Sequence, residues 1–138
     1  MYGPIEYIGI AGAGIMGGGI AQMFAEHGKR VLLWDIAPGV IGRALETISG
    51  RLAASAAKGR FPAGQIEHIF GCIRPAAGLE ELGACDLLIE AIPEEPAAKR
   101  KLLAALSLLS GALLGTNTRS LSLRELARAV RGPERFLG

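Results

Sequence analysis

The chain has 138 residues, a length that suits a single domain in which about two-thirds of the unfolded chain's surface is buried. Half of the residues are hydrophobic and 20% are charged, so the composition excludes an intrinsically disordered protein. The net charge of +2 is too small to indicate nucleic acid or a membrane surface as a partner.

The first residues lack the features of a secretory signal. Residues 2–6 contain no basic residue and no long apolar segment, and no apolar run in the sequence approaches the length that spans a membrane. We therefore expect a cytoplasmic protein without membrane contact. The apolar residues 7–11 carry β-type side chains and predict the first strand.

A glycine motif, G-x-G-x-x-G at Gly12, Gly14 and Gly17, follows this strand and leads into a helical pattern. In a dinucleotide-binding turn the first glycine permits the tight turn and the second lets a pyrophosphate approach the backbone. The third lets the helix pack closely on the strand, with the positive end of the helix facing the phosphates. The motif predicts a cofactor site; the alternative is a glycine turn that only shapes the chain.

A second apolar run, residues 31–34, ends at Asp35, which lies 23 residues after Gly12. At this spacing a carboxylate accepts hydrogen bonds from the ribose hydroxyls of a dinucleotide and repels a 2′-phosphate. No basic residue follows directly, because the next three residues are Ile36, Ala37 and Pro38. The sequence therefore predicts NAD(H) rather than NADP(H). The alternative is a surface aspartate beside a structural turn.

Two helical patterns separate the second strand from the third. Beyond Pro38, apolar residues recur at helical spacing to about Lys58, and a shorter pattern covers residues 63–70. We interpret residues 37–70 as a helical insert in the form of a hairpin. Residues 72–75 then form a short candidate strand, which its final proline confines to an end or an edge of the sheet.

Cys72 and Cys85 are the two cysteines of the sequence. Their spacing is not that of a metal site, and two thiols do not make a disulfide framework. We interpret them as buried or inert thiols in a reducing compartment, and the sequence indicates no metal.

The continuous apolar run at residues 86–92 is typical of a strand that a parallel sheet buries on both faces. A helix follows, with an apolar stripe that ends before Gly111. The nearest approach to a basic run, residues 99–101, lies in this helix and is interpreted as its solvent-facing side. Residues 112–117 predict the next strand and its exit.

The last part of the chain continues the alternation of helix and strand. Ser122 and Glu125 form an S-x-x-E capping box before another helical pattern, and residues 135–138 indicate the start of one more strand. We therefore predict an α/β fold with a doubly wound, mostly parallel sheet, a Rossmann fold, over residues 1–138. Its ligand should lie outside the carboxyl ends of the strands.

Five blocks of the sequence resemble the N-terminal, NAD-binding domain of the L-3-hydroxyacyl-CoA dehydrogenases. Together they extend over nearly the entire chain: residues 12–22, Trp34 with Asp35, residues 86–94, residues 116–118 and residues 133–138. The family oxidises the 3-hydroxyl of an acyl-CoA and passes a hydride to NAD. The resemblance thus implies NAD as cofactor and, in the intact enzyme, an acyl-CoA substrate and a homo-oligomer.

The resemblance also implies roles for individual positions. The pyrophosphate is held by the glycine turn, the adenosine ribose by the end of the second strand, and the nicotinamide side by the ends of the later strands. Lys99 helps to bind NAD, with a solvated helix residue as the alternative. The cofactor-binding set comprises Gly12, Ala13, Gly14, Ile15, Met16, Gly17, Asp35, Ile36, Ala91, Ile92, Glu94, Lys99 and Asn117.

Two positions concern the substrate. Lys58 matches a family position that touches the CoA moiety; the alternative is a cation placed favourably at a helix C-terminus. Arg119 stands where the family has a serine that hydrogen-bonds substrate and cofactor. A guanidinium has no acceptor capacity and cannot replace a hydroxyl, but it can reach a phosphate or a carboxylate.

The family's general base is a histidine just beyond the position that corresponds to Gly138, and its partner is a glutamate further on. His27 and His68, the two histidines of the sequence, do not match that position, so we assign no catalytic residue. We expect the chain to end before the last strands and the C-terminal helical domain, to bind NAD, and to turn over little or nothing. The strand at residues 113–116 would then be an open edge and lead to self-association or low stability.

Two alternatives to this interpretation remain at the level of the sequence. The chain is a non-catalytic NAD-binding module in the first. In the second it belongs to a dehydrogenase of a different hydroxy acid, acidic and not linked to CoA, with Arg119 as the partner of the acidic group.

Overall fold

The computed structural model describes residues 3–118 and 121–138, and in these residues six strands form one sheet. The sheet has the order β3-β2-β1-β4-β5-β6, and each neighbouring pair runs parallel. The order reverses between β1 and β4, which confirms the predicted doubly wound fold. The strands are β1 (Tyr7–Ala11), β2 (Arg30–Trp34), β3 (Ile73–Pro75), β4 (Leu87–Glu90), β5 (Leu113–Thr116) and β6 (Phe136–Leu137).

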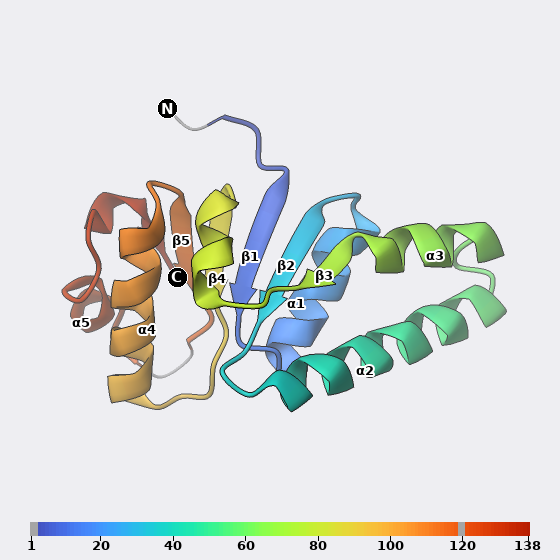
Figure 1. Cartoon of the computed structure of the whole chain (residues 1–138), viewed down its shortest axis with the longest axis horizontal. Coiled ribbons are helices and arrows are strands. Elements are labelled where there is room, and N and C mark those ends of the chain that lie inside the picture. The colour runs from blue at the N-terminus through green and yellow to red at the C-terminus, as the bar shows by residue number, and fades with distance from the viewer. Residues whose placement is uncertain (1–2, 119–120) are drawn as a thin grey trace.

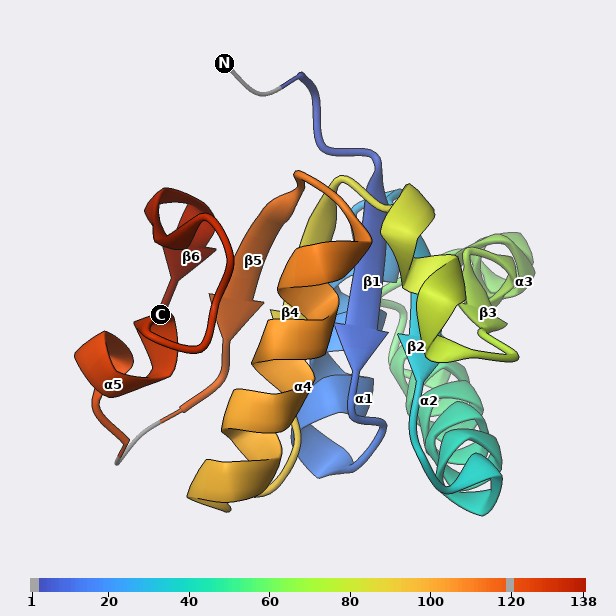
Figure 2. The ribbon, with the colours of Figure 1, turned by 60° about the vertical axis from the view of Figure 1, so that its left-hand side comes forward.

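Helices cover both faces of the sheet (Figure 1). One layer contains α1 (Ile15–Glu26), α2 (Pro38–Ala57) and α3 (Ala63–Gly71), and α2 and α3 form a hairpin between β2 and β3. The other layer contains the 3-10 helix η1 (Leu79–Ala84), α4 (Pro96–Leu109) and α5 (Leu123–Ala127). Figure 2 shows α4 in front of the sheet and α1 with α2 behind it. A second 3-10 turn, η2 (Pro133–Arg135), leads into β6.

Alternate residues of the central strands face opposite layers, as the two-residue period of a strand requires. Ile8 and Ile10 of β1 are fully buried in the core beneath α1, α2 and α3. Ala11 and Leu88 are buried in the core beneath η1, α4 and α5. The central strands are therefore apolar on both faces, which explains the uninterrupted apolar runs of the sequence.

The edges of the sheet differ from the prediction in one respect. β3 lies at an edge and ends in Pro75, as its proline predicts. The predicted open edge at β5 is wrong, because β6 pairs with β5 through Leu114 opposite Phe136 and Gly115 opposite Leu137. Although β6 has only two residues, it pairs with the outer side of β5.

Cys85 is buried in the second core, where burial, reinforced by the neighbouring Asp86 charge, raises the pKa of its thiol to about 11. The thiol therefore stays protonated at neutral pH and is a poor nucleophile. Cys72 is half-buried, and its Sγ donates to the carbonyl of His68 at 3.3 Å. Across residues 3–118 and 121–138, no helix combines the length and the apolar character needed to cross a membrane.

Candidate cofactor-binding site

The glycine turn between β1 and α1 is shaped by two close backbone contacts. Gly12 has φ +117°, and a Cβ on it would lie 2.6 Å from the carbonyl carbon and oxygen of Ala91 at the end of β4. A Cβ on Gly17 would overlap the carbonyl oxygen of Gly12. A side chain at either position would force the turn away from β4 or lift α1 off the turn.

Gly14 serves a different purpose, because it lies against open space. A Cβ built on Gly14 would meet nothing within 4 Å. Gly14 is also the N-cap of α1, and among the described residues no side chain caps this helix end. The first N–H groups of α1 and the positive end of the helix are thus presented at an accessible, flat backbone surface, which fits a pyrophosphate.

Asp35 is directed at this turn from the end of β2. Its Oδ2 accepts a hydrogen bond from the backbone N–H of Ala13 at 2.9 Å, and its Oδ1 accepts from Ala37 N at 2.9 Å. Each carboxylate oxygen keeps acceptor capacity beyond one hydrogen bond, so the group can also accept from ribose hydroxyls beside the turn. A carboxylate next to the pyrophosphate cradle selects against the extra phosphate of NADP(H).

A hollow of about 280 Å³ lies between the glycine turn and the ends of β4 and β5. It brings together residues that are up to 105 positions apart in the chain, from Gly12 to Asn117. Five predicted cofactor residues do not line this hollow. Ala13 lies in the turn, Gly17 lies in α1 and Asp35 accepts from the Ala13 N–H, whereas Ile36 is 86% exposed and Lys99 is buried. The residues that line the hollow are Gly12, Gly14, Ile15, Met16, Ala91, Ile92, Pro93, Glu94 and Asn117.

Lys99 lies beneath this hollow and is fully buried, so its interpretation as a solvent-facing residue is wrong. Its Nζ lies 2.7 Å from Glu90 Oε2 and 3.2 Å from Glu94 Oε1. It also donates to the carbonyl oxygen of Ile92 at 2.9 Å. Lys99 falls at helical spacing from the buried Leu103 and Leu106, and this spacing was an unused signal that it lies on the inner face of α4.

Glu90 and Thr116 are buried polar residues next to Lys99 and the hollow that the sequence reasoning missed. Both are buried, they lie opposite each other on β4 and β5, and the Thr116 hydroxyl donates to Glu90 Oε1. Glu90 Oε2 additionally accepts from Ile92 N at 2.7 Å. The available signal was a carboxylate inside a strand that is otherwise apolar on both faces, because burying a carboxylate requires partners.

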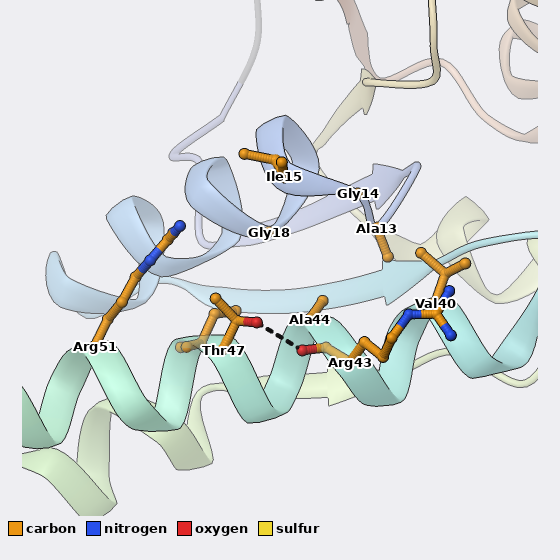
Figure 3. A pocket seen from close by; sticks show the side chains of 10 residues that line it. Ala13, Gly14, Ile15, Gly18, Val40, Arg43, Ala44, Thr47 and Arg51 are labelled. Atoms are coloured by element: carbon orange, nitrogen blue, oxygen red, sulfur yellow. Dashed lines mark hydrogen bonds between the residues drawn. The ribbon is translucent and has the colours of Figure 1, made fainter.

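A second hollow, of about 230 Å³, lies on the other side of the glycine turn, between α1 and α2 (Figure 3). Arg43, Thr47 and Arg51 project from α2 on the side of α1, and Thr47 Oγ1 donates to the Arg43 carbonyl at 2.9 Å. These three residues are also absent from the predicted set. Their spacing of four was a readable signal, since it places them on one helix face.

The remaining predicted residues lie away from the glycine turn or outside the residues that the structure describes. Lys58 is exposed at the C-terminal end of α2, where its backbone N–H donates to Ala54 and Ser55. Arg119 falls outside the residues that the structure describes. His27 ends α1 just before β2, and His68 lies in α3 before β3. Both histidines thus precede strands and lie toward the amino ends of the sheet, opposite the cofactor side.

Comparison with known proteins gives a consistent result. The sequence matches the family described as "3-hydroxyacyl-CoA dehydrogenase, NAD binding domain" over residues 7–138. It is 35% identical over 136 residues to the 3-hydroxyadipyl-CoA dehydrogenase of Escherichia coli (strain K12), covering 97% of this chain and 29% of that protein. It is equally 35% identical over 136 residues to the fatty acid oxidation complex subunit alpha of Pseudomonas savastanoi pv. phaseolicola, covering 97% of this chain and 19% of that protein.

The fold is shared with solved structures of similar proteins. The (S)-3-hydroxybutyryl-CoA dehydrogenase of Ralstonia eutropha superposes with a TM-score of 0.93 at 30% identity, over 96% of this chain and 48% of that one. The chain thus spans less than half the length of each of these three proteins.

Proposed function

Since the chain belongs to the 3-hydroxyacyl-CoA dehydrogenase family, as its NAD-binding domain, we propose that it holds the cofactor in the oxidation of an (S)-3-hydroxyacyl-CoA to a 3-oxoacyl-CoA. In this proposal residues 1–138 form one Rossmann domain and residues 37–70 a helical insert within it. NAD supplies the acceptor for the hydride that leaves the 3-carbon of the substrate. The protein binds and orients the cofactor.

The observation that supports this proposal is the combination of an open Gly14 with Asp35 beside it. The structure leaves room for a pyrophosphate where a Cβ on Gly14 would stand, and places the carboxylate of Asp35 at the same turn. Adenosine ribose then lies at Asp35, and the nicotinamide reaches the hollow at the ends of β4 and β5.

Titration of the chain with NADH, followed by NADH fluorescence, tests the cofactor site. We expect saturable binding of NADH and at least tenfold weaker binding of NADPH, because a 2′-phosphate would lie against Asp35. Gly14→Ala separates folding from binding: the methyl group has room in the fold but occupies the place of the pyrophosphate. This variant should keep the thermal stability of the wild type and lose NADH binding. Unchanged NADH affinity of Gly14→Ala would refute the proposed cradle.

We assign the CoA moiety to the exposed face of α2. Arg51 and Lys58 are seven residues apart, close to two helical turns, so they project on the same side of the helix. Both are exposed, and Arg43 adds a third cation two turns before Arg51. Cations along one helix face suit the phosphates of CoA. Calorimetry with free CoA should show weaker binding to Lys58→Ala than to the wild type, with Arg60→Ala as a matched control.

The same proposal includes a lack of turnover by a polypeptide of these 138 residues. General-base catalysis typically contributes 10²–10⁴-fold to rate, and the two histidines lie toward the opposite end of the sheet from the cofactor hollow. The expected result is NADH binding without measurable reduction of acetoacetyl-CoA. Turnover that disappears in His27→Ala or His68→Ala would refute this part of the proposal.

A second candidate function differs only in the substrate, and Arg119 favours it. This residue follows Thr118, whose hydroxyl donates to Glu94 Oε2 at 2.9 Å. A guanidinium so close in sequence to the cofactor site suits an acidic substrate. Binding of acetoacetyl-CoA and of acetoacetate to the NADH-saturated chain, in the wild type and in Arg119→Ser, distinguishes the two. Preference for the free acid that is lost in Arg119→Ser supports the second candidate.

A further inference from the structure

We propose that Glu90 and Thr116 are positioning residues for the nicotinamide end of the cofactor, acting through the buried ammonium of Lys99. The proposal gives Lys99 a role different from direct cofactor binding. It rests on the proposed placement of the nicotinamide at the ends of β4 and β5.

The ammonium of Lys99 is surrounded by oxygen atoms of the protein. It lies within hydrogen-bond distance of Glu90 Oε2 at 2.7 Å and of the carbonyls of Ile92 at 2.9 Å and Asn117 at 3.4 Å, with Glu94 Oε1 at 3.2 Å. An ammonium has three protons, so these four acceptors use its capacity completely. Lys99 is also 0% exposed. Its donors are therefore directed at oxygen atoms of the protein.

Lys99 connects the loop after β4 with the loop after β5, and both loops line the hollow. Ile92 lies in the loop after β4, and Asn117 follows β5; both line the space that the nicotinamide would enter. Backbone pairing of the strands ends near this point, where Asn117 N donates to Glu90 O at 2.8 Å. Beyond it, Lys99 is the group that holds both carbonyls, so the spacing of the two loops depends on the position of its ammonium.

Glu90 fixes the position of the Lys99 ammonium. One carboxylate oxygen, Oε2, accepts from both Lys99 Nζ and Ile92 N, each at 2.7 Å. The other, Oε1, accepts from the Thr116 hydroxyl on the neighbouring strand. The carboxylate is thus held from three directions and sets Lys99 and the Ile92 backbone in one geometry. Glu90 accepts from the N–H of Ile92, and Lys99 donates to its carbonyl, so both backbone groups of Ile92 are hydrogen-bonded to this ion pair.

The same loop meets the glycine turn. Ala91 N donates to Ala11 O at 2.8 Å, and a Cβ on Gly12 would collide with the Ala91 carbonyl. A displacement of residues 91–93 therefore changes the width of the hollow between the turn and β4. We infer that Glu90, Thr116 and Lys99 set this width for a planar ring, although none of the three lines the hollow.

The competing explanation is that Glu90, Thr116 and Lys99 only stabilise the fold. Variants that keep the fold but lack the ion pair distinguish this explanation from a positioning role. A buried ion pair contributes little net stability, and apolar residues of similar volume often replace it without loss. A double variant, Glu90→Leu with Lys99→Met, should therefore fold. It would lack the ammonium that joins Ile92 and Asn117.

The experiment compares two ligands that share the adenosine and pyrophosphate and differ at the nicotinamide. NADH and ADP-ribose are titrated into the wild type, Glu90→Gln, Thr116→Val and the double variant, with thermal unfolding recorded for each. We expect NADH affinity to fall about tenfold in Glu90→Gln and in the double variant, the size of one lost charge-assisted contact, and less in Thr116→Val. ADP-ribose affinity should change less than about twofold. The fluorescence enhancement of bound NADH should fall in parallel.

Ser107→Ala is the matched control for general destabilisation. Ser107 is buried at the other end of α4, where its hydroxyl donates to Ala104 O and accepts from Arg131 N. It should lower the unfolding temperature without changing the ratio of NADH to ADP-ribose affinity.

Three outcomes would overturn the inference or its basis, and they are distinguishable. A double variant with wild-type affinity for NADH would show that the network is structural only. Equal losses for NADH and ADP-ribose in Glu90→Gln would show a general effect on the fold and overturn the inference. Failure of the wild type to bind either ligand would instead refute the cofactor site itself.

Discussion

At the scale of single residues, two glycines in the first turns of α1 differ in their tolerance for a side chain. A Cβ on Gly17 would overlap the Gly12 carbonyl oxygen, whereas a Cβ on Gly19, two residues later in the same helix, would meet nothing within 4 Å. The motif glycine is therefore required by a backbone contact, and Gly19 is not.

This difference predicts opposite effects of the same substitution. Gly17→Ala should destabilise the fold by about 1–3 kcal/mol and abolish NADH binding, because the helix must move off the turn. Gly19→Ala should stabilise the fold by up to about 1 kcal/mol through helix propensity, with NADH affinity unchanged. Urea denaturation and NADH titration measure both quantities. A stable Gly17→Ala variant that binds NADH would contradict the geometry.

Asp86 holds the segment that leads into β1. Its Oδ2 accepts from Glu6 N at 3.0 Å and from Tyr7 N at 2.9 Å, and these hydrogen bonds lower the pKa of its carboxyl below the ordinary value of 3.8. A carboxyl with a lowered folded-state pKa contributes stability above its unfolded pKa, and this contribution is lost as the pH falls through the folded-state pKa.

Asp86→Asn should therefore be less stable than the wild type at pH 7, and the difference should shrink as the pH approaches 3. Urea denaturation at a series of pH values measures it, with the exposed Glu67→Gln as control. Parallel stability curves for Asp86→Asn and the wild type across the whole range would show that the two hydrogen bonds carry no charge-dependent stabilisation.

At the scale of elements, the end of α4 depends on a side chain from the far end of the chain. The Arg135 guanidinium donates to Ser110 O at 2.9 Å and Ala112 O at 2.8 Å with Nη1. With Nη2 it donates to Arg131 O at 2.7 Å and Ser107 O at 3.4 Å. It thus satisfies carbonyls at the C-terminus of α4 and before β5, and connects both to the turn that precedes β6.

Arg135→Ala should lower the free energy of unfolding by about 1–3 kcal/mol, because hydrogen bonds to a charged group are lost and partly buried carbonyls are left unpaired. Arg135→Lys should recover only part of this loss, since an ammonium lacks the forked geometry of a guanidinium. Chemical denaturation provides the measurement, and the exposed Arg128→Ala is the charge-matched control. Equal stability of Arg135→Ala and Arg128→Ala would contradict this role.

Two short helical elements differ from what the local sequence pattern predicts. The Ser122 hydroxyl accepts from Glu125 N at 3.3 Å, as its half of the capping box predicts, but α5 ends at Ala127 although the apolar pattern runs on to Val130. The six-residue η1 was not predicted. Both segments are short, so their hydrogen bonds depend on packing against α4 and β1 more than on helix propensity.

At the scale of the whole molecule, the sheet ends in two short or interrupted strands. β3 ends in Pro75, and β6 has two residues. Neither offers a long row of unpaired N–H and C=O groups to another chain. We therefore predict that a polypeptide of these 138 residues does not self-associate through its sheet edges, in place of the self-association expected from an open β5.

Light scattering across a range of protein concentrations tests this prediction, with a monomeric mass expected throughout. The informative variant is Leu137→Lys, which places a charge at the outer strand on a side chain that is 51% exposed. Oligomers of the wild type that disappear in this variant would show that the β6 edge does associate.

Local patterns in the sequence were enough to predict the type and order of the strands and longer helices, the family, and the cofactor. Those features follow from neighbours in the chain: the periods of two and 3.6 residues, the glycine motif, and Asp35 at the end of the next strand. The pairing of the charged groups, in contrast, depends on the folded arrangement of the elements. Lys99 and Glu90 are 9 residues apart, Thr116 and Glu90 are 26, and Arg135 and Ser110 are 25. Whether such a charge faces water or a partner depends on which elements pack together, because a buried charge is tolerated only where the fold supplies its hydrogen bonds.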